Sequence, residues 1–208
     1  MSQLALPLAW PADPGDDAFL IGPSNERAVR VLDGWAAWPV RAGLLVGPRK
    51  SGRSLLARIF ARKSGGVVMD GAEAAPEAAL FHAWNRAEAA NRPLLIVADQ
   101  APPAWDVTLP DLRSRLAASP LAEIDPPDEA LARALLERGL ARRGLDARPE
   151  LVDWIANRVE RSHVTIQRAI DALDTGSMER RRGLSMPLAR AALAEAGLLA
   201  PSEPTEHS

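Results

Sequence analysis

One glycine-rich segment constrains the fold of this chain more than any other feature. Residues 47–54 read GPRKSGRS; they follow the short apolar run 44–46 and precede a helical pattern over 53–63. Glycines between a buried strand and a helix let backbone N–H groups and the helix N-terminus face an anion, which is the context of a phosphate-binding loop. The segment therefore predicts an α/β fold built on a parallel sheet.

Side chains of this loop extend the prediction to a nucleotide. Ser54 stands where a hydroxyl would reach magnesium, Arg53 stands where the motif calls for lysine, and Lys50 adds a second cation. The alternative is a plain glycine turn that joins a strand to a helix. Together with one downstream carboxylate, the candidate nucleotide-binding residues are Gly47, Lys50, Gly52, Arg53, Ser54, Leu55 and Asp70.

Further strands and helices flank the loop. Asn25 is a candidate N-cap for a helix over 25–35. Trp35, Trp84 and Trp154 each fall on an apolar helix face, so we expect them in the core. The spacing of apolar residues also predicts strands over 66–70, 94–98 and 121–124, and helices over 76–90 and 112–116.

The pattern changes after Pro126. Beyond that residue the apolar spacing is helical over 128–143, 149–159, 162–174 and 187–196. We therefore expect an α/β core followed by an all-helical lid. The predicted parts are a proline-rich flexible tail over 1–18, the core over 19–126, the lid over 127–200 and a disordered tail over 201–208.

Composition excludes several classes of site and partner. Cysteine is absent, and the spacing of His82, His163 and His207 predicts no metal site. The net charge is -2, and residues 127–200 hold 12 arginines against 11 acidic residues, so direct DNA contact is not expected. The sequence has neither an apolar run long enough to span a bilayer nor the pattern of a signal peptide. We expect a cytoplasmic protein without a membrane partner.

Several segments match one known family, in order along nearly the whole chain. They are 17–25 (DAFLIGPSN), 80–85 (LFHAWN), 94–97 (LLIV) with Pro102 and Pro103, 161–165 (RSHVT) and 184–187 (LSMP). The segment 109–116 (LPDLRSRL) is the most specific internal match, and the phosphate loop lies at the expected distance from segment 17–25. Together these segments resemble the DnaA-related AAA+ regulators of the Hda type.

The resemblance implies both a fold and a function. The fold would be a reduced AAA+ core with a parallel sheet and a helical lid. The function would be regulation of chromosomal replication initiation, through binding to the sliding clamp (the β subunit of DNA polymerase III) and promotion of DnaA-ATP inactivation. Implied partners are the clamp, DnaA and a second copy of the chain. The alternative is a small P-loop ATPase or nucleotide-binding enzyme with weak intrinsic turnover.

The chain departs from the family pattern in the hydrolytic residues. Arg53 replaces the lysine, Asp70 is followed by Gly71 where a catalytic glutamate would stand, and Thr165 occupies the position of the sensor-2 arginine. The segment between Ser54 and strand 94–98 is short by about one βα unit, so 66–70 is either the Walker B strand or the strand before it. These departures predict little intrinsic hydrolysis, with ADP or ATP and magnesium bound, or no nucleotide at all.

Two further sites follow from the same resemblance. Arg115 matches the arginine finger that acts in trans on the nucleotide of a neighbouring subunit, so we expect it to be the catalytic residue. The N-terminal segment resembles the clamp-binding motif, with a glutamine for oriented hydrogen bonds and leucines for an apolar groove. The candidate clamp-binding residues are Gln3, Leu4, Leu6, Pro7 and Leu8.

Overall fold

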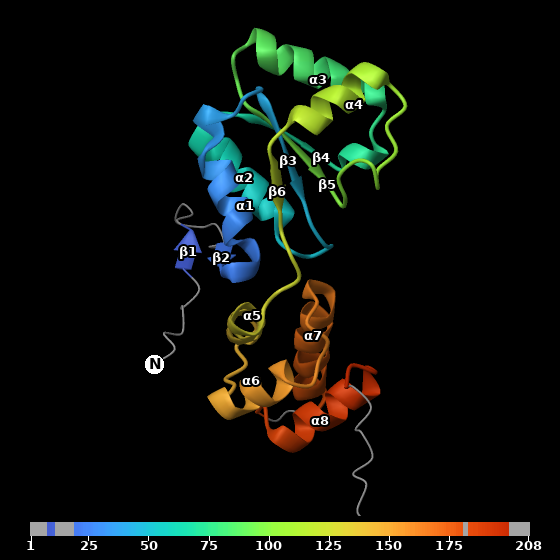
Figure 1. Cartoon of the computed structure of the whole chain (residues 1–208). Helices are drawn as coiled ribbons and strands as arrows, with labels where there is room; N and C mark the ends of the chain where they lie inside the picture. The colour runs from blue at the N-terminus through green and yellow to red at the C-terminus, as the bar shows by residue number, and fades with distance from the viewer. Residues whose placement is uncertain (1–7, 11–18, 181–182, 200–208) are drawn as a thin grey trace, which may run out of the picture. The chain divides into compact units, whose positions relative to one another are not determined.

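The computed structural model describes residues 8–10, 19–180 and 183–199, and it consists of an α/β core and an all-helical lid (Figure 1). The chain divides into two compact units between Pro126 and Pro127, where the sequence pattern changes. The described residues include no helix with the length and apolar character needed to cross a bilayer.

The core contains two sheets and four helices, with two short 3-10 turns, η1 (Trp35–Ala37) and η2 (Ala72–Ala74). Its strands are β1 (Leu8–Trp10), β2 (Phe19–Ile21), β3 (Ala42–Val46), β4 (Val67–Asp70), β5 (Leu94–Ala98) and β6 (Leu121–Glu123). Its helices are α1 (Pro23–Asp33), α2 (Arg53–Ser64), α3 (Glu77–Ala89) and α4 (Pro110–Ala118).

A four-stranded parallel sheet forms the centre of the core, in the order β4-β5-β3-β6. Val46 pairs in register with Ala98 and with Glu123, and Asp70 pairs with Val97. The carboxyl ends of all four strands therefore lie at one edge of the sheet. The predicted α/β class with a parallel sheet and a helical lid is confirmed.

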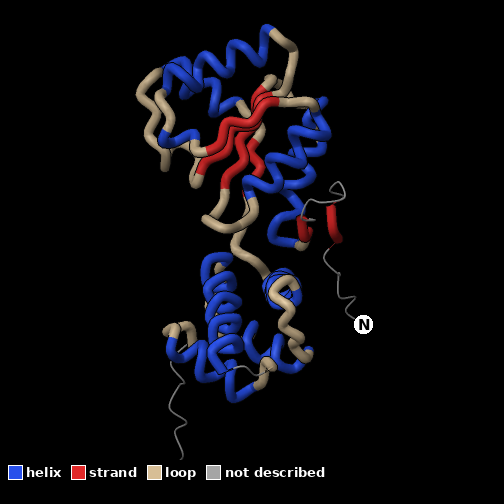
Figure 2. Tube along the Cα trace, turned by 180° about the vertical axis from the view of Figure 1, so that it is seen from behind, coloured by secondary structure: helices blue, strands red, loops and turns tan. Residues whose placement is uncertain are grey.

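Helices cover both faces of this sheet (Figure 2). Alternate strand residues point to opposite faces, so Leu45 and Leu95 pack with α1 and α2, whereas Leu44 and Ile96 pack with α3 and α4. Trp84 of α3 is fully buried in the second layer, as expected from its helix face. Trp35 is partly buried against the first layer.

The N-terminal region differs from the sequence prediction in two places. Helix α1 begins at Pro23 with Gly22 as its N-cap, and Asn25 lies inside the first turn instead of capping it. The buried Asn25 side chain accepts a hydrogen bond from Gly22 N and donates one to Leu20 O, so it fixes the chain before the helix. The segment expected as tail contains β1, which pairs antiparallel with β2.

The lid has its own apolar core, to which all four of its helices contribute, and Trp154 packs against it partly buried. Its helices are α5 (Glu129–Ala141), α6 (Pro149–Ala156), α7 (His163–Arg180) and α8 (Met186–Glu195). Helix α7 continues well past the predicted end at residue 174. Gly176 lies inside this helix, where its missing side chain lets α8 pack closely. A Cβ added at Gly176 would lie 3.1 Å from Ala192 Cβ.

Gly43 of β3 lets a tryptophan ring approach the strand that leads into the phosphate loop. A Cβ built on Gly43 would lie 2.5 Å from Cη2 of Trp38. The Trp38 ring is fixed by stacking on Phe60, with ring centroids 5.5 Å apart, and by a 2.9 Å hydrogen bond from its Nε1 to Val31 O. The ring therefore has little freedom to move aside for a larger residue.

We predict that Gly43→Ala lowers the free energy of unfolding by about 1–3 kcal/mol, because overpacking forces the Trp38 ring from its position. Chemical denaturation of the purified variant measures this. The double variant Gly43→Ala, Trp38→Ala should lose less stability than the sum of the single variants. Gly34→Ala is the control, since its nearest new contact would be 3.5 Å away. Equal effects at Gly34 and Gly43 would contradict the packing argument.

Candidate nucleotide-binding site

The loop between β3 and α2 has the backbone of a phosphate-binding turn. Gly52 adopts a left-handed conformation with φ +88° immediately before α2, and Lys50 is left-handed as well, with φ +66°. Gly47 lies so close to the neighbouring strand that a Cβ would be 2.8 Å from Ile124 O. Only glycine fits that approach. The turn therefore opens onto the N-terminus of α2, where the first backbone N–H groups of a helix are available to an anion.

Two side chains of the loop differ in their surroundings. Lys50 is exposed on the turn, whereas Ser51 is buried. The Ser51 Oγ has no hydrogen-bond partner among the described residues. A buried hydroxyl without a partner is the kind of group that a bound ligand or water satisfies. Leu55 points the other way and packs, partly buried, against the apolar layer under α1 and α2.

Ser54 and Asp70 meet at the carboxyl edge of the sheet. The Ser54 hydroxyl donates a 2.8 Å hydrogen bond to Oδ2 of Asp70, and Gly71 N donates to Oδ1. Strand β4, which Asp70 ends, is separated from β3 by β5. This contact indicates that β4 takes the place of the Walker B strand, so the shortened segment lacks the unit before it.

Arg53 is engaged by the neighbouring strand. Its guanidinium donates to Ala98 O, the last carbonyl of β5, and forms an ion pair with Asp99. The Arg53 side chain is 14% exposed and that of Asp99 is 50% exposed. An anion that enters the loop would therefore compete with Asp99 for this guanidinium.

A second carboxylate, Glu73, completes the arrangement around Asp99. The turn η2 brings Glu73 back toward β5, where its Oε1 accepts a 2.8 Å hydrogen bond from Asp99 N. Neither Glu73 nor Asp99 was a candidate from the sequence. The signal for Asp99 was its place directly after strand 94–98, at the sheet edge where ligands of α/β proteins bind. Glu73 gave no such signal.

The residues present fit a bound nucleotide better than nucleotide hydrolysis. The glycine turn, the Ser51 hydroxyl and the Ser54–Asp70 pair are suited to phosphate oxygens and to a magnesium ion, which commonly takes one carboxylate and waters. The described residues contain no cluster of three metal-ligating side chains. Gly71 provides no carboxylate to orient water, and Glu73 is bonded to Asp99 N.

Arg115 lies on α4 and is held against α3. Its Nη1 donates to Asn85 Oδ1 at 2.9 Å, and its Nη2 lies 3.1 Å from Asp111 Oδ2. The guanidinium carbon is 4.8 Å from the centroid of the Phe81 ring. Its side chain is 26% exposed, so part of it remains accessible to another molecule. The residue is therefore positioned before any partner arrives.

Glu77 fixes the start of the helix that carries Arg115. The Glu77 carboxylate accepts hydrogen bonds from Thr108 N, Thr108 Oγ1 and Leu109 N, at 2.7, 2.9 and 2.8 Å. The backbone bonds from Thr108 and Leu109 hold the pKa of Glu77 below its ordinary value of 4.5. Arg113 donates to Val107 O and Thr108 O from the other side. The loop of residues 107–109 is therefore bonded to both α3 and α4.

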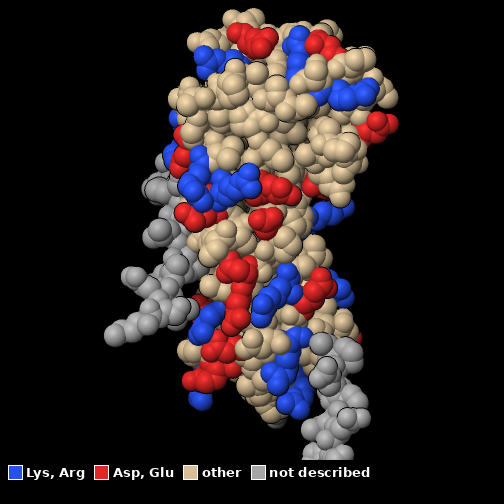
Figure 3. Space-filling model, viewed as in Figure 1, with Lys and Arg blue, Asp and Glu red and all other residues tan. Residues whose placement is uncertain are grey.

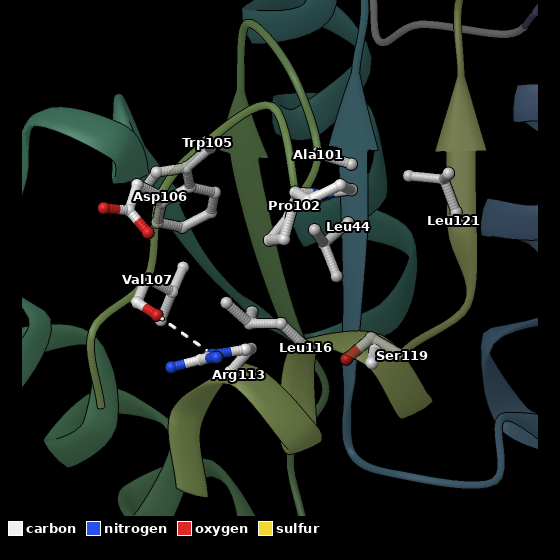
Figure 4. Close-up of a pocket in the computed structure, with 12 residues that line it drawn as sticks. Leu44, Ala101, Pro102, Trp105, Asp106, Val107, Arg113, Leu116, Ser119 and Leu121 are labelled. Atoms are coloured by element: carbon white, nitrogen blue, oxygen red, sulfur yellow. Dashed lines mark hydrogen bonds between the residues drawn. The ribbon is translucent and has the colours of Figure 1, made fainter. Parts of the chain in front are cut away.

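An apolar cavity of about 410 Å³ lies beside α4 (Figure 4). Leu44 and Leu121 form the sheet side, Leu116 forms the helix side, and the loop with Trp105 closes it. Arg113 lines it too, with its bond to Val107 drawn in the same view. The cavity is therefore an apolar recess beside the same helix that carries Arg115.

The remaining predicted positions lie elsewhere. Of the clamp-binding candidates, Gln3, Leu4, Leu6 and Pro7 lie outside the described residues, whereas Leu8 begins β1. Thr165 belongs to the lid, where its backbone N and its hydroxyl are both bonded to the Ser162 hydroxyl at the start of α7. Ser162 therefore caps α7, and Thr165, in the first turn of that helix, carries no charge.

Comparison with known proteins relates this fold to replication proteins. A family model described as "Hda, lid domain" matches residues 128–193. An uncharacterized protein of Haemophilus influenzae is 30% identical over 115 residues, which cover 55% of this chain and 50% of that protein. The chromosomal replication initiator protein DnaA of Cutibacterium acnes is 30% identical over 80 residues, which cover 38% of this chain and 16% of DnaA. The chain thus spans half or less of these two relatives.

Solved structures share the fold at low sequence identity. Domain III of the Thermotoga maritima replication initiation protein DnaA superposes with a TM-score of 0.68 at 15% identity, over 87% of this chain and 95% of that domain. AMPPCP-bound DnaA from Aquifex aeolicus superposes with a TM-score of 0.60 at 16% identity, over 78% of this chain and 67% of that structure. These similarities establish the AAA+ fold, and the second structure holds a nucleotide analogue.

We predict that Asp99→Asn strengthens ADP binding about two- to fivefold, since it removes the carboxylate that competes with phosphate for Arg53. Isothermal titration calorimetry of the purified protein with ADP and magnesium measures the change. Asp33→Asn is the matched control, because Asp33 pairs with Lys63 on the surface of the core. Unchanged or weaker ADP binding by Asp99→Asn would contradict the competition.

Proposed function

From the premise that this chain is a DnaA-related AAA+ protein with a lid of the Hda family, we propose that it regulates chromosomal replication initiation by acting on DnaA. In this proposal it binds the sliding clamp through its N-terminal segment and promotes conversion of DnaA-ATP to the ADP form. Its own nucleotide site holds ADP or ATP and turns it over slowly, if at all.

One observation carries the proposal: Arg53, the cation at the lysine position of the phosphate loop, is paired within the protein. Arg53 bonds to Asp99 and Ala98, so its charge is balanced before any phosphate arrives. Hydrolysis needs cations free to follow the developing charge and a carboxylate that orients water. With Gly71 after Asp70 and Glu73 bonded to Asp99 N, this site lacks that carboxylate.

The site residues have separate roles in holding a nucleotide. Magnesium, when bound with a nucleotide, screens the charge of the phosphates. Ser54 and Asp70 would hold the ion, because their oxygens already lie 2.8 Å apart. Gly47 and Gly52 shape the turn whose N–H groups would receive the phosphate oxygens, with Lys50 exposed beside them.

Arg115 is the group that would act on DnaA. An arginine supplied by a neighbouring molecule stabilises transition-state charge on the γ-phosphate. Phe81, Asn85 and Asp111 fix the Arg115 guanidinium, which reduces the side-chain freedom it would lose on docking. The apolar cavity beside α4 would accept a side chain of the same partner.

A weak P-loop ATPase is the second candidate. The Ser54–Asp70 pair favours it, since a hydroxyl and a carboxylate in contact are what a magnesium-nucleotide requires. Steady nucleotide turnover by the isolated chain, abolished by Asp70→Asn, would select this candidate over the regulator.

We predict that Arg115→Ala abolishes the stimulation of DnaA-ATP hydrolysis in the presence of loaded clamp, a loss of about 10³-fold or more for an arginine finger. Hydrolysis of labelled ATP on DnaA is the measurement. Arg86→Ala is the control, because Arg86 is an exposed arginine on α3. The thermal unfolding temperature of the Arg115→Ala protein shows whether the variant is still folded, so that a loss of stability is distinguished from the loss of the arginine finger. Full stimulation by a folded Arg115→Ala protein would refute the role.

We predict that Leu6→Ala weakens binding to the sliding clamp about tenfold or more, because a leucine buried in an apolar groove contributes ~1.5–3 kcal/mol. Surface plasmon resonance with immobilised clamp measures the affinity. Leu121→Ala, a change at an exposed apolar residue of β6, serves as the control. Equal clamp affinity of wild type and Leu6→Ala would exclude this segment as the tether.

A further inference from the structure

Charges in the lid are separated in space although they nearly balance in number. Carboxylates from three helices pair with three arginines. The ion pairs are Arg133 with Glu137 and Asp153, Arg143 with Asp171 and Asp174, and Arg161 with Glu129. Five carboxylates are used in this way, so the remaining arginines face fewer opposite charges than the composition indicates.

Arg158, Arg168 and Arg190 form a group that we call the lid arginine patch. The guanidinium carbons of Arg158 and Arg190 lie 4.9 and 5.7 Å from the ring centroid of Trp154. Arg168 donates to Ala196 O, at 3.3 Å, and to no other group among the residues that the structure describes. In the part of the lid that the structure describes, none of the three pairs with a carboxylate. Figure 3 shows Lys and Arg side chains gathered over α8, apart from the acidic side chains over α5 and α6.

A cavity of about 370 Å³ joins two members of the patch. Arg158 and Arg168 line it, together with Asn157 and Thr165. Glu160 also lines it, and Glu160 Oε2 lies 3.5 Å from Thr165 Oγ1. The cavity therefore offers two guanidinium groups and two neutral polar side chains against one carboxylate. Its net charge is positive.

Trp154 prepares this patch for an anion. The indole packs partly buried against the lid core, so it does not move freely. A guanidinium held over an aromatic ring keeps its N–H edge available and loses less freedom on binding than a free arginine. Trp154 is therefore a positioning residue, because it acts through Arg158 and Arg190.

We infer that the lid arginine patch binds phosphate groups, with the backbone of a nucleic acid as its ligand. Guanidinium groups match phosphate oxygens in a bidentate manner. The three arginines come from the turn after α6, from α7 and from α8, so one carboxylate is too small to satisfy them. A nucleic-acid strand repeats a phosphate along its length and would contact all three. The sequence expectation of no DNA contact rested on net charge and could not register this separation.

Fluorescence anisotropy of the full chain with a labelled single-stranded oligonucleotide tests the inference. The affinity should fall with salt, and the slope of log affinity against log salt should shrink by about 0.7 for each patch arginine that is replaced. The variants are Arg168→Gln and the double variant Arg158→Gln, Arg190→Gln. Arg148→Gln, an exposed lid arginine outside the patch, should leave the slope unchanged. Trp154→Phe should weaken binding less than the double variant does.

Competitors distinguish the sources of phosphate. Displacement of the oligonucleotide by ADP or pyrophosphate at the patch, lost in the same variants, would identify a nucleoside phosphate as the ligand and support the site. Displacement by an acidic peptide alone would overturn the phosphate assignment. Binding that is absent, or equal in wild type and patch variants, would overturn the site. ADP affinity at the phosphate loop, measured in parallel with Ser54→Ala, reports separately on the proposed function.

Discussion

The ion pair between Arg53 and Asp99 is the contact on which the candidate nucleotide site depends. A guanidinium that is only 14% exposed is costly without a partner, because its charge is partly removed from water. Asp99 supplies that partner from the next strand, so the charge of Arg53 is balanced without a nucleotide. Under the proposed function, phosphate binding would exchange one anion for another at Arg53. A loop with the shape of a phosphate-binding turn can in this way hold a cation that is already engaged.

Asp99 can pair with Arg53 only because the sheet is parallel. Parallel strands bring their carboxyl ends to one edge, so residues far apart in sequence meet after β3, β4 and β5. The adjacent residues Arg53 and Ser54 join three segments into one network, because Arg53 bonds to Ala98 O and to Asp99, and Ser54 bonds to Asp70. Deletion of an outer strand would not disturb this network, because β5 and β4 keep their order beside β3.

Local sequence patterns predicted the elements better than the contacts between them. The glycine segment predicted the strand, loop and helix, and Asp70, a candidate that follows an apolar run, lies within hydrogen-bond distance of Ser54. Asp99 was missed, since its role depends on which strand lies next to β3, and sequence spacing does not reveal strand order. Asn25 was misread as a cap, because its side chain bonds backward to Gly22 and Leu20, a choice set by the β2–α1 junction.

Net charge does not describe how the charges of the lid are distributed, for a related physical reason. Coulomb interactions between side chains act over a few ångströms at the surface, so each carboxylate mainly neutralises the arginine beside it. Five carboxylates of the lid are therefore neutralised by Arg133, Arg143 and Arg161. A count of charges would instead distribute these carboxylates evenly over all arginines of the lid. In the core, Asp99 likewise neutralises Arg53, and Asp111 neutralises Arg115. A partner can use those two arginines by exchanging an ion pair, whereas the arginines around Trp154 have no carboxylate to exchange in the described structure.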